Sequence, residues 1–180
     1  MTKTNNLRML LLMLVSFVLS AIPTLHAEGK VIMLHPHERI INPNDTIGAQ
    51  KVFLAGTIDM GSSVDWQKGL AQFFETKKGN WILFNPRQEK WDGKKKGEMD
   101  YQVNWELSHL EESSFIIMNI VGTSKSPISL LELGLFARSG KMAVVCDPTF
   151  YRYDNVRITC RKYGVHLYPT LNALLGTEFK

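Results

Sequence analysis

Short apolar runs and longer amphipathic stretches alternate along the chain from residue 51 onward. Apolar runs without polar alternation are typical of strands that are buried on both faces of a parallel sheet. The predicted strands are 52–55, 81–84, 115–121, 142–146 and 165–167. The other stretches predict helices at 64–76, 101–112, 126–140, 155–163 and 170–175. Strands that alternate with helices predict an α/β fold with a doubly wound, mostly parallel, five-stranded sheet.

The predicted helix at 126–140 carries a single carboxylate, Glu132, with apolar residues on almost every side. Ser126 fits the N-cap position and Gly140 is a typical stop signal. A helix that is apolar nearly all round is expected to be buried. Glu132 then has two explanations: it serves chemistry, or it completes a capping box with the backbone N–H of Ser129.

The amino terminus has the layout of a secretory signal peptide. Lys3 and Arg8 precede an apolar run at 9–25, and the small residue Ala27 follows it. This pattern predicts a signal peptide at 1–27 and a secreted or periplasmic location. The alternative is an uncleaved anchor, because the run approaches the roughly 17 residues that a membrane span needs. A membrane would be a partner only in that case.

Residues 28–50 predict an extended N-terminal arm, and 51–180 have the length of one domain with its own core. Removal of 1–27 leaves 19 basic and 17 acidic residues, so the net charge falls from +4 to +2. This charge is too small to indicate nucleic-acid binding.

Cysteine and histidine residues give no clear site. Cys146 and Cys160 could form a disulfide in an exported protein or remain as free buried thiols, and their spacing does not fit a zinc site. His35 and His37 have no third ligand nearby. We therefore predict no metal site.

Unusual polar residues follow the predicted strands and could converge at the carboxyl edge of the sheet, where open α/β sheets bind ligands. These groups lie at 56–59, 85–91 and 122–132 and at Asp147. The chain lacks GxGxxG, GxxxxGK[ST] and GxSxG motifs, which leaves dinucleotide, P-loop and hydrolase-elbow sites without support. The remaining candidates are two carboxylates, Glu106 and Glu132, a pair that could cleave a glycosidic bond.

Several blocks, taken in order, resemble the nucleoside 2-deoxyribosyltransferase superfamily, in its 2-deoxyribosyltransferase-like branch. These are residues 53–59 with Trp66-Gln67, Asn85-Pro-Arg87 with Trp91, 102–106, and 126–134. The resemblance implies a flavodoxin-like Rossmann fold. It implies that Glu132 attacks C1′ of the sugar and forms a covalent glycosyl-enzyme, while Glu106 positions the nucleophile and the sugar. It further implies a small-molecule nucleoside or nucleotide substrate, no cofactor and a homo-oligomer.

Eight further residues are candidates for substrate binding. Tryptophan side chains could stack on a base, Asn85 and Arg87 could bind base or phosphate, and Asp59 could orient a sugar hydroxyl. The alternative for the tryptophans is packing, and for Asn85 and Arg87 it is loop hydrogen bonding and surface charge. The candidates are Gly56, Asp59, Trp66, Asn85, Arg87, Trp91, Ser126 and Ser129.

Two departures from the family pattern leave the substrate open. Phe53 stands where transferases acting on free nucleosides carry Tyr, and Ser126 stands where they carry Asp. A Ser at this position resembles relatives that hydrolyse nucleoside 5′-monophosphates, in which a hydroxyl and helix-terminal N–H groups hold the phosphate. We therefore expect cleavage or transfer of an N-glycosidic bond, with three alternatives: a 5′-monophosphate hydrolase, an NAD hydrolase, or a non-catalytic nucleotide-binding module.

Overall fold

The structure is a computed structural model that describes residues 29–180. The predicted signal peptide at 1–27 lies outside the described residues. Within them, no helix has the length and apolar character needed to cross a membrane.

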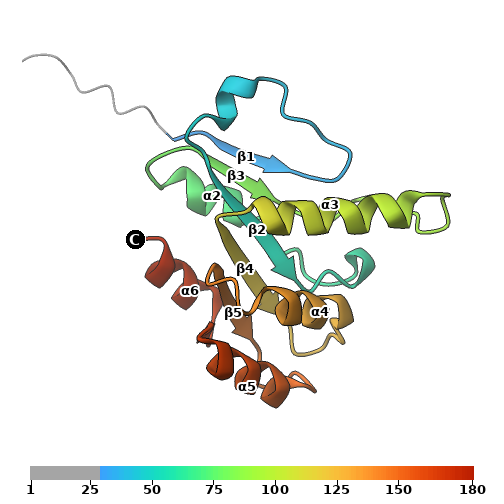
Figure 1. Cartoon of the computed structure of the whole chain (residues 1–180), viewed down its shortest axis with the longest axis vertical. Helices are drawn as coiled ribbons and strands as arrows, with labels where there is room; N and C mark the ends of the chain where they lie inside the picture. Colours follow the sequence, from blue (N-terminus) through green and yellow to red (C-terminus); the bar gives the residue numbers. More distant parts are fainter. Residues whose placement is uncertain (1–28) are drawn as a thin grey trace, which may run out of the picture.

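A six-stranded, fully parallel sheet forms the centre of the molecule (Figure 1). Its strand order is β1-β3-β2-β4-β5-β6. The strands are β1 (Val31–Leu34), β2 (Gln50–Gly56), β3 (Trp81–Phe84), β4 (Phe115–Ile120), β5 (Met142–Cys146) and β6 (His166–Tyr168). The parallel α/β architecture predicted from the sequence is confirmed, and it is consistent with a flavodoxin-like fold.

The predicted count of five strands is wrong, because the segment interpreted as an extended arm contributes a sixth. Val31 to Leu34 pair in register with Trp81 to Phe84 of β3. An apolar segment beside the open edge of β3 satisfies backbone groups on both strands, which a surface arm would leave to water. The rest of the arm is irregular apart from a 3₁₀ turn, η1 (Pro43–Thr46).

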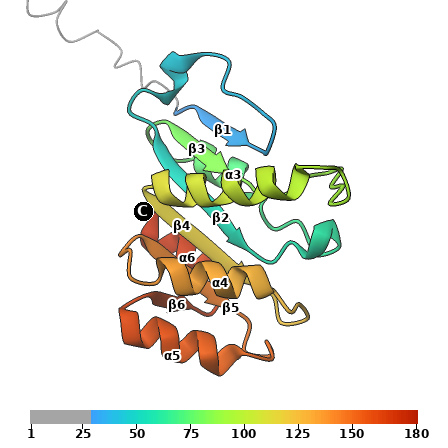
Figure 2. The ribbon, with the colours of Figure 1, turned by 45° about the vertical axis from the view of Figure 1, so that its right-hand side comes forward.

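Helices cover both faces of the sheet. Figures 1 and 2 show α3 (Glu98–Glu112), α4 (Pro127–Phe136) and α5 (Tyr153–Tyr163) on one face. The opposite face carries α2 (Leu70–Glu75) and α6 (Leu171–Glu178). Two apolar cores result, one on each face. The first contains Phe53, Phe84, Trp105, Met118 and Leu133, and the second Val52, Leu83, Phe74, Phe179 and Leu174.

Two helices differ from their prediction in physically informative ways. α2 begins at Leu70, not near residue 64, because Asp65 accepts a hydrogen bond from Lys68 N and holds a turn there. α3 begins at Glu98, three residues before the predicted start, and its apolar side chains are divided, since Leu110 is buried whereas Val103 and Leu107 are exposed. The buried face also carries Gln102 and Trp105.

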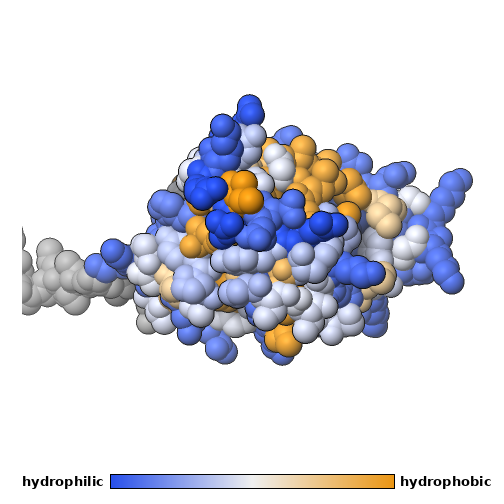
Figure 3. Space-filling view, turned by 90° about the horizontal axis from the view of Figure 1, so that it is seen from below, coloured by the Kyte–Doolittle hydropathy of each residue, from blue (hydrophilic) through white to orange (hydrophobic). Residues whose placement is uncertain are grey.

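Helix α4 is buried on one face only. Ser129, Glu132 and Leu133 are buried, whereas Ile128, Leu131 and Leu135 are more than half exposed. The space-filling view shows that hydrophobic residues gather in patches on this side of an otherwise hydrophilic surface (Figure 3). The expectation of a fully buried helix is therefore wrong, because an apolar sequence also tolerates an exposed face.

The chain changes its winding direction at β2, since β3 lies on one side of β2 and β4 on the other. The connections that leave the carboxyl ends of β2 and β4 therefore diverge and open a crevice. Gly56 ends β2 at this point with a φ of 125°, and a Cβ atom there would lie 2.2 Å from the Asn119 carbonyl oxygen of β4. Close pairing of the two strands at the crevice thus requires glycine.

We expect Gly56→Ala to lower the free energy of unfolding by at least about 2 kcal/mol, because the methyl group meets backbone and the positive φ is strained. Urea denaturation followed by circular dichroism measures this change. Gly134→Ala on α4 is the control, since nothing lies within 4 Å of its Cβ position; it should gain up to about 1 kcal/mol from helix propensity. Equal effects of the two substitutions would contradict the close-approach explanation.

Candidate functional site

A cavity of about 410 Å³ lies at the carboxyl ends of β2 and β4. Its walls come from four segments that are far apart in the sequence. They are the turn after β2 at 56–61, the loop after β3 with Pro86, Gln88 and Trp91, the α3 residues Met99, Gln102, Val103 and Glu106, and the start of α4 at 126–129 with Glu132. The predicted convergence is thus found for three of the strand-end groups, whereas Asp147 does not line the cavity.

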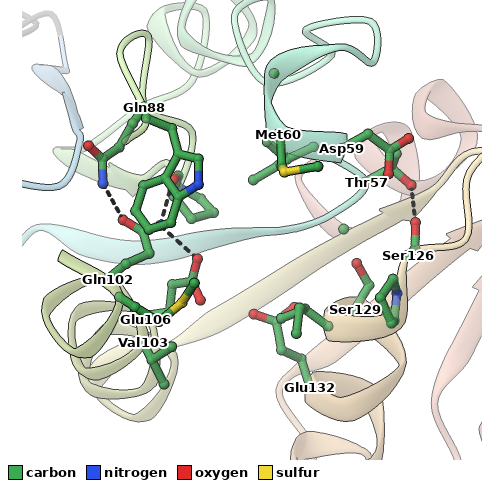
Figure 4. A pocket seen from close by; sticks show the side chains of 18 residues that line it. Thr57, Asp59, Met60, Gln88, Gln102, Val103, Glu106, Ser126, Ser129 and Glu132 are labelled. Carbon is green, nitrogen blue, oxygen red and sulfur yellow. Dashed lines mark hydrogen bonds between the residues drawn. The ribbon is translucent and has the colours of Figure 1, made fainter. Parts of the chain in front are cut away.

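Two carboxylates face each other across this cavity. Glu106 points from α3 and Glu132 from α4 into the same space (Figure 4). Glu132 is only 6% exposed. Burial and the negative charge of Glu106 raise the pKa of Glu132 to about 8. Burial also raises the pKa of Glu106. The pair therefore holds at least one proton at neutral pH, as expected for two acids that share a poorly solvated site.

The capping-box explanation of Glu132 does not fit this geometry. Glu132 accepts no hydrogen bond from Ser129 N within residues 29–180, and its carboxylate is directed at the cavity (Figure 4). A buried carboxylate next to a second one is unfavourable for the folded state, and acidic groups whose pKa is raised in this way cluster at functional sites.

Glu106 is positioned by an amide side chain that the sequence analysis did not select. Gln102 Nε2 donates hydrogen bonds to Glu106 Oε1 at 2.7 Å and to the Pro86 carbonyl oxygen at 2.9 Å. Gln102 Oε1 accepts from Gln88 Nε2 at 2.6 Å. The signal was present in the sequence, because residues 102 and 106 lie four apart on one helix face.

This amide chain continues to the segment that follows β1. Gln88 Nε2 also lies 3.2 Å from Glu98 Oε1, and His37 Nε2 lies 2.6 Å from the same oxygen. The His37 contact lowers the pKa of Glu98 to about 2. The His37 ring stacks on Tyr101 with a centroid distance of 4.0 Å. The outer end of α3 is therefore held against the segment between β1 and β2.

Hydroxyl groups form a second chain on the opposite wall of the cavity. Thr57 Oγ1 lies 2.6 Å from Ser126 Oγ, and Ser126 Oγ lies 2.8 Å from Ser124 Oγ. Ser124 Oγ donates to Asp59 Oδ1 at 2.6 Å. Ser126 has a left-handed backbone (φ 40°) and does not cap α4 with its side chain. Its side chain serves this polar chain and not the helix.

The structure brings seven of the ten predicted site residues to the cavity wall. They are Gly56, Asp59, Trp91, Glu106, Ser126, Ser129 and Glu132. At Gly56 a Cβ atom would also meet the Asn119 backbone of the neighbouring strand.

The other three predicted residues, Trp66, Asn85 and Arg87, do not line the cavity. Trp66 Nε1 donates to the Thr57 carbonyl oxygen at 3.1 Å, and Asn85 Oδ1 accepts from Arg87 N at 3.0 Å. The Arg87 guanidinium turns toward the loop before α2, where it donates to Ser63 Oγ. These side chains support the loops that carry the site, in line with the loop hydrogen bonding considered for Asn85.

Several lining residues were not predicted because nothing in their sequence context marks them as functional. Met60, Met99, Val103 and Ile128 give the cavity apolar walls, and a sequence pattern does not separate such residues from ordinary surface or core positions. Thr57 lies within the strand-end block 53–59 and could have been selected from its place directly after Gly56.

The two cysteines are free and buried, and burial raises the pKa of Cys146 to about 12 and of Cys160 to about 11. Neither lines the cavity. Across residues 29–180 no group of three or more His, Cys, Asp or Glu side chains is arranged to hold a metal ion.

A family model described as nucleoside 2-deoxyribosyltransferase like matches residues 49–150. The chain belongs to this nucleoside 2-deoxyribosyltransferase-like family. The match extends from β2 past β5 and includes every residue that lines the cavity. No curated protein matches the chain in sequence. The residues that build the site therefore all lie in the segment that matches the family, whereas β1, α5 and α6 lie outside this segment.

The raised pKa of Glu132 predicts a pH-dependent stability. Between its ordinary value of 4.5 and about 8, the folded state holds a proton that the unfolded state has released. The free energy of unfolding should therefore fall as the pH rises through this window. We expect Glu132→Gln to remove the Glu132 share of this dependence, leaving that of Glu106, and to be more stable than the wild type by about 2–4 kcal/mol at pH 8.

Urea denaturation at pH 5 and pH 8 checks this expectation. Glu75→Gln on α2 is the control, because Glu75 is exposed and lies away from the cavity. Parallel pH dependences for the wild type and Glu132→Gln would show that Glu132 is not the group that carries it.

Proposed function

We propose that the protein cleaves the N-glycosidic bond of nucleosides or deoxynucleosides through a covalent glycosyl-Glu132 intermediate. The observation that carries this proposal is the buried carboxylate of Glu132 directed at Glu106 across a cavity large enough for a small molecule. Family membership supports the same chemistry.

In the first step a carboxylate oxygen of Glu132 attacks C1′, and the bond between C1′ and the base nitrogen breaks with its electron pair leaving on the base. Positive charge develops on the sugar and favours the ionised form of Glu132. The proton of the acidic pair is then on Glu106, which donates it to the leaving base. Gln102 fixes the orientation of Glu106 by its hydrogen bond to Oε1.

In the second step an acceptor attacks C1′, the bond between C1′ and the Glu132 oxygen breaks, and the Glu106 carboxylate takes the proton that the acceptor loses. A nucleobase as acceptor makes the protein a transferase, and water makes it a hydrolase. The apolar side chains of Met60, Met99 and Val103 leave few polar groups to hold water near the intermediate. This favours a nucleobase acceptor, which stacks on apolar walls and on Trp91.

A non-catalytic nucleotide-binding module is a weaker explanation of the site. Keeping Glu132 buried beside Glu106 destabilises the fold, and strain of this kind is maintained where activity requires it.

Two expectations from the sequence stay predictions. N-terminal sequencing of the protein from its host checks whether 1–27 are removed on export to a secreted or periplasmic location. Light scattering of the purified protein checks the expected homo-oligomer.

The function is tested with deoxynucleosides, ribonucleosides, their 5′-monophosphates and NAD, each with and without adenine as acceptor. We expect base release or base exchange with at least one nucleoside, and a loss of at least about a thousandfold in Glu132→Gln because the nucleophile is removed. Chromatography of the released bases measures both. No base release from any compound by the wild type would overturn the proposal, and Glu75→Gln should keep full activity.

Gln102→Leu tests the positioning of Glu106. The substitution keeps the side-chain volume but removes the hydrogen bond that lowers the Glu106 pKa. We expect kcat to fall roughly tenfold to a hundredfold, with a pH profile displaced to higher pH. Asn104→Leu is the matched control, since its amide lies on the exposed side of the same helix and donates to the Asp100 carbonyl oxygen. A pH profile equal to that of the wild type would contradict a positioning role for Gln102.

A further inference from the structure

The hydroxyl chain on the cavity wall has a direction that its members impose on one another. Asp59 is a carboxylate and only accepts, so Ser124 must donate its proton to Asp59 Oδ1. Ser124 Oγ then accepts both from Ser126 N at 3.0 Å and from the Ser126 hydroxyl at 2.8 Å. Each of these hydroxyl protons is therefore committed to the next member of the chain.

The same reasoning fixes the other end of the chain. Because the Ser126 proton points to Ser124, the contact of 2.6 Å with Thr57 requires the Thr57 hydroxyl to donate to Ser126 Oγ. Thr57 Oγ1 in turn accepts from Val121 N at 3.0 Å. The direction runs from the Val121 amide to the Asp59 carboxylate without a break. Thr57, Ser124 and Ser126 are buried, which protects this order from exchange with water.

Ser126 consequently presents a lone pair and no proton to the cavity. A group that donates a hydrogen bond, such as a sugar hydroxyl, satisfies this lone pair. A phosphate oxygen only accepts, so it would meet an acceptor. From the sequence, the Ser126 hydroxyl was expected to donate a hydrogen bond to a phosphate. Through Ser124, Asp59 instead makes it a hydrogen-bond acceptor.

The charges around the cavity also disfavour a phosphate group. Among the described residues, three carboxylates line the wall, those of Asp59, Glu106 and Glu132, and no Lys, Arg or His does. The Arg87 guanidinium, which could have held a phosphate, is directed at Ser63 and the Val64 carbonyl oxygen instead. The amino end of α4 would by itself favour an anion, but Asp59 already places one there, and Pro127 has no N–H to offer.

We propose that Asp59 determines substrate specificity: acting through Ser124, it turns Ser126 into a hydrogen-bond acceptor for a sugar hydroxyl and excludes nucleoside 5′-monophosphates. This inference rests on the proposed function for the identity of the ligand. It narrows that function to unphosphorylated nucleosides and sets aside the 5′-monophosphate and NAD alternatives.

The test compares the binding of four 2′-deoxynucleosides with that of their 5′-monophosphates by calorimetry. It uses the Glu132→Gln protein, which keeps the cavity and does not turn ligands over. We expect at least one nucleoside to bind roughly tenfold or more tightly than its 5′-monophosphate, because the phosphate meets like charge and an acceptor. Asp59→Asn in this background removes the charge and lets an amide N–H reverse the chain. Ser124→Ala frees the Ser126 proton. Each should reduce the preference at least about fivefold.

Two controls separate specificity from structural damage. Asp59→Glu should keep the preference, and Asp154→Asn on α5, which removes an exposed carboxylate paired with Arg157, should leave it unchanged. A merely structural role of Asp59 would weaken nucleoside and 5′-monophosphate equally and keep their ratio, which would overturn the proposal. Binding of a 5′-monophosphate as tight as that of its nucleoside, or no binding of any of the eight ligands, would overturn it as well.

Base release by the wild type distinguishes this inference from the proposed function. Nucleoside-selective binding without base release would refute the catalytic function and leave the specificity intact. Base release from 5′-monophosphates at the same rate as from nucleosides would support the catalytic function and refute the specificity.

Discussion

The placement of Glu132 beside Glu106 in a poorly solvated cavity is the constraint on which the rest of the site depends. Two acids in such a place cannot both be ionised at neutral pH without a large loss of stability. The fold supplies the compensation elsewhere, through an apolar core that holds α3 and α4 against one face of the sheet and a second core on the opposite face. The reactivity of the pair and its destabilising effect therefore have one origin, which is the burial of both carboxyl groups between these two helices.

The parts of the fold that depend on continuous apolar runs could be predicted from the sequence. β3 and β5 have the predicted bounds, because four or five consecutive apolar residues leave no alternative to a buried strand. β1 is not predicted as a strand, since four apolar residues beside a polar segment do not show whether they pair with the edge of a sheet. The side of α3 that faces the cavity carries Gln102 and Glu106, and hydrophobic periodicity does not register such a polar face.

The site was predictable to the extent that chain position determines it. Residues directly after β2 and at the start of α4 reached the cavity because the backbone places them there. Asn85 and Arg87 also follow a strand, yet their side chains turn away, since the direction of a loop side chain depends on tertiary partners such as Ser63. The order of protons along Thr57, Ser126, Ser124 and Asp59 is a further property of this kind, because it exists only after four residues from two loops have met.

The sixth strand has a consequence for where this domain begins. The family match starts at residue 49, but β1 lies eighteen positions earlier and completes the edge of the sheet beside β3. A protein trimmed to the matched segment would expose the apolar edge of β3, which is a template for pairing with other chains. It would also lose His37, which holds the outer end of α3 through Glu98. Loss of the segment before the family match is therefore expected to promote self-association through the uncovered edge of β3.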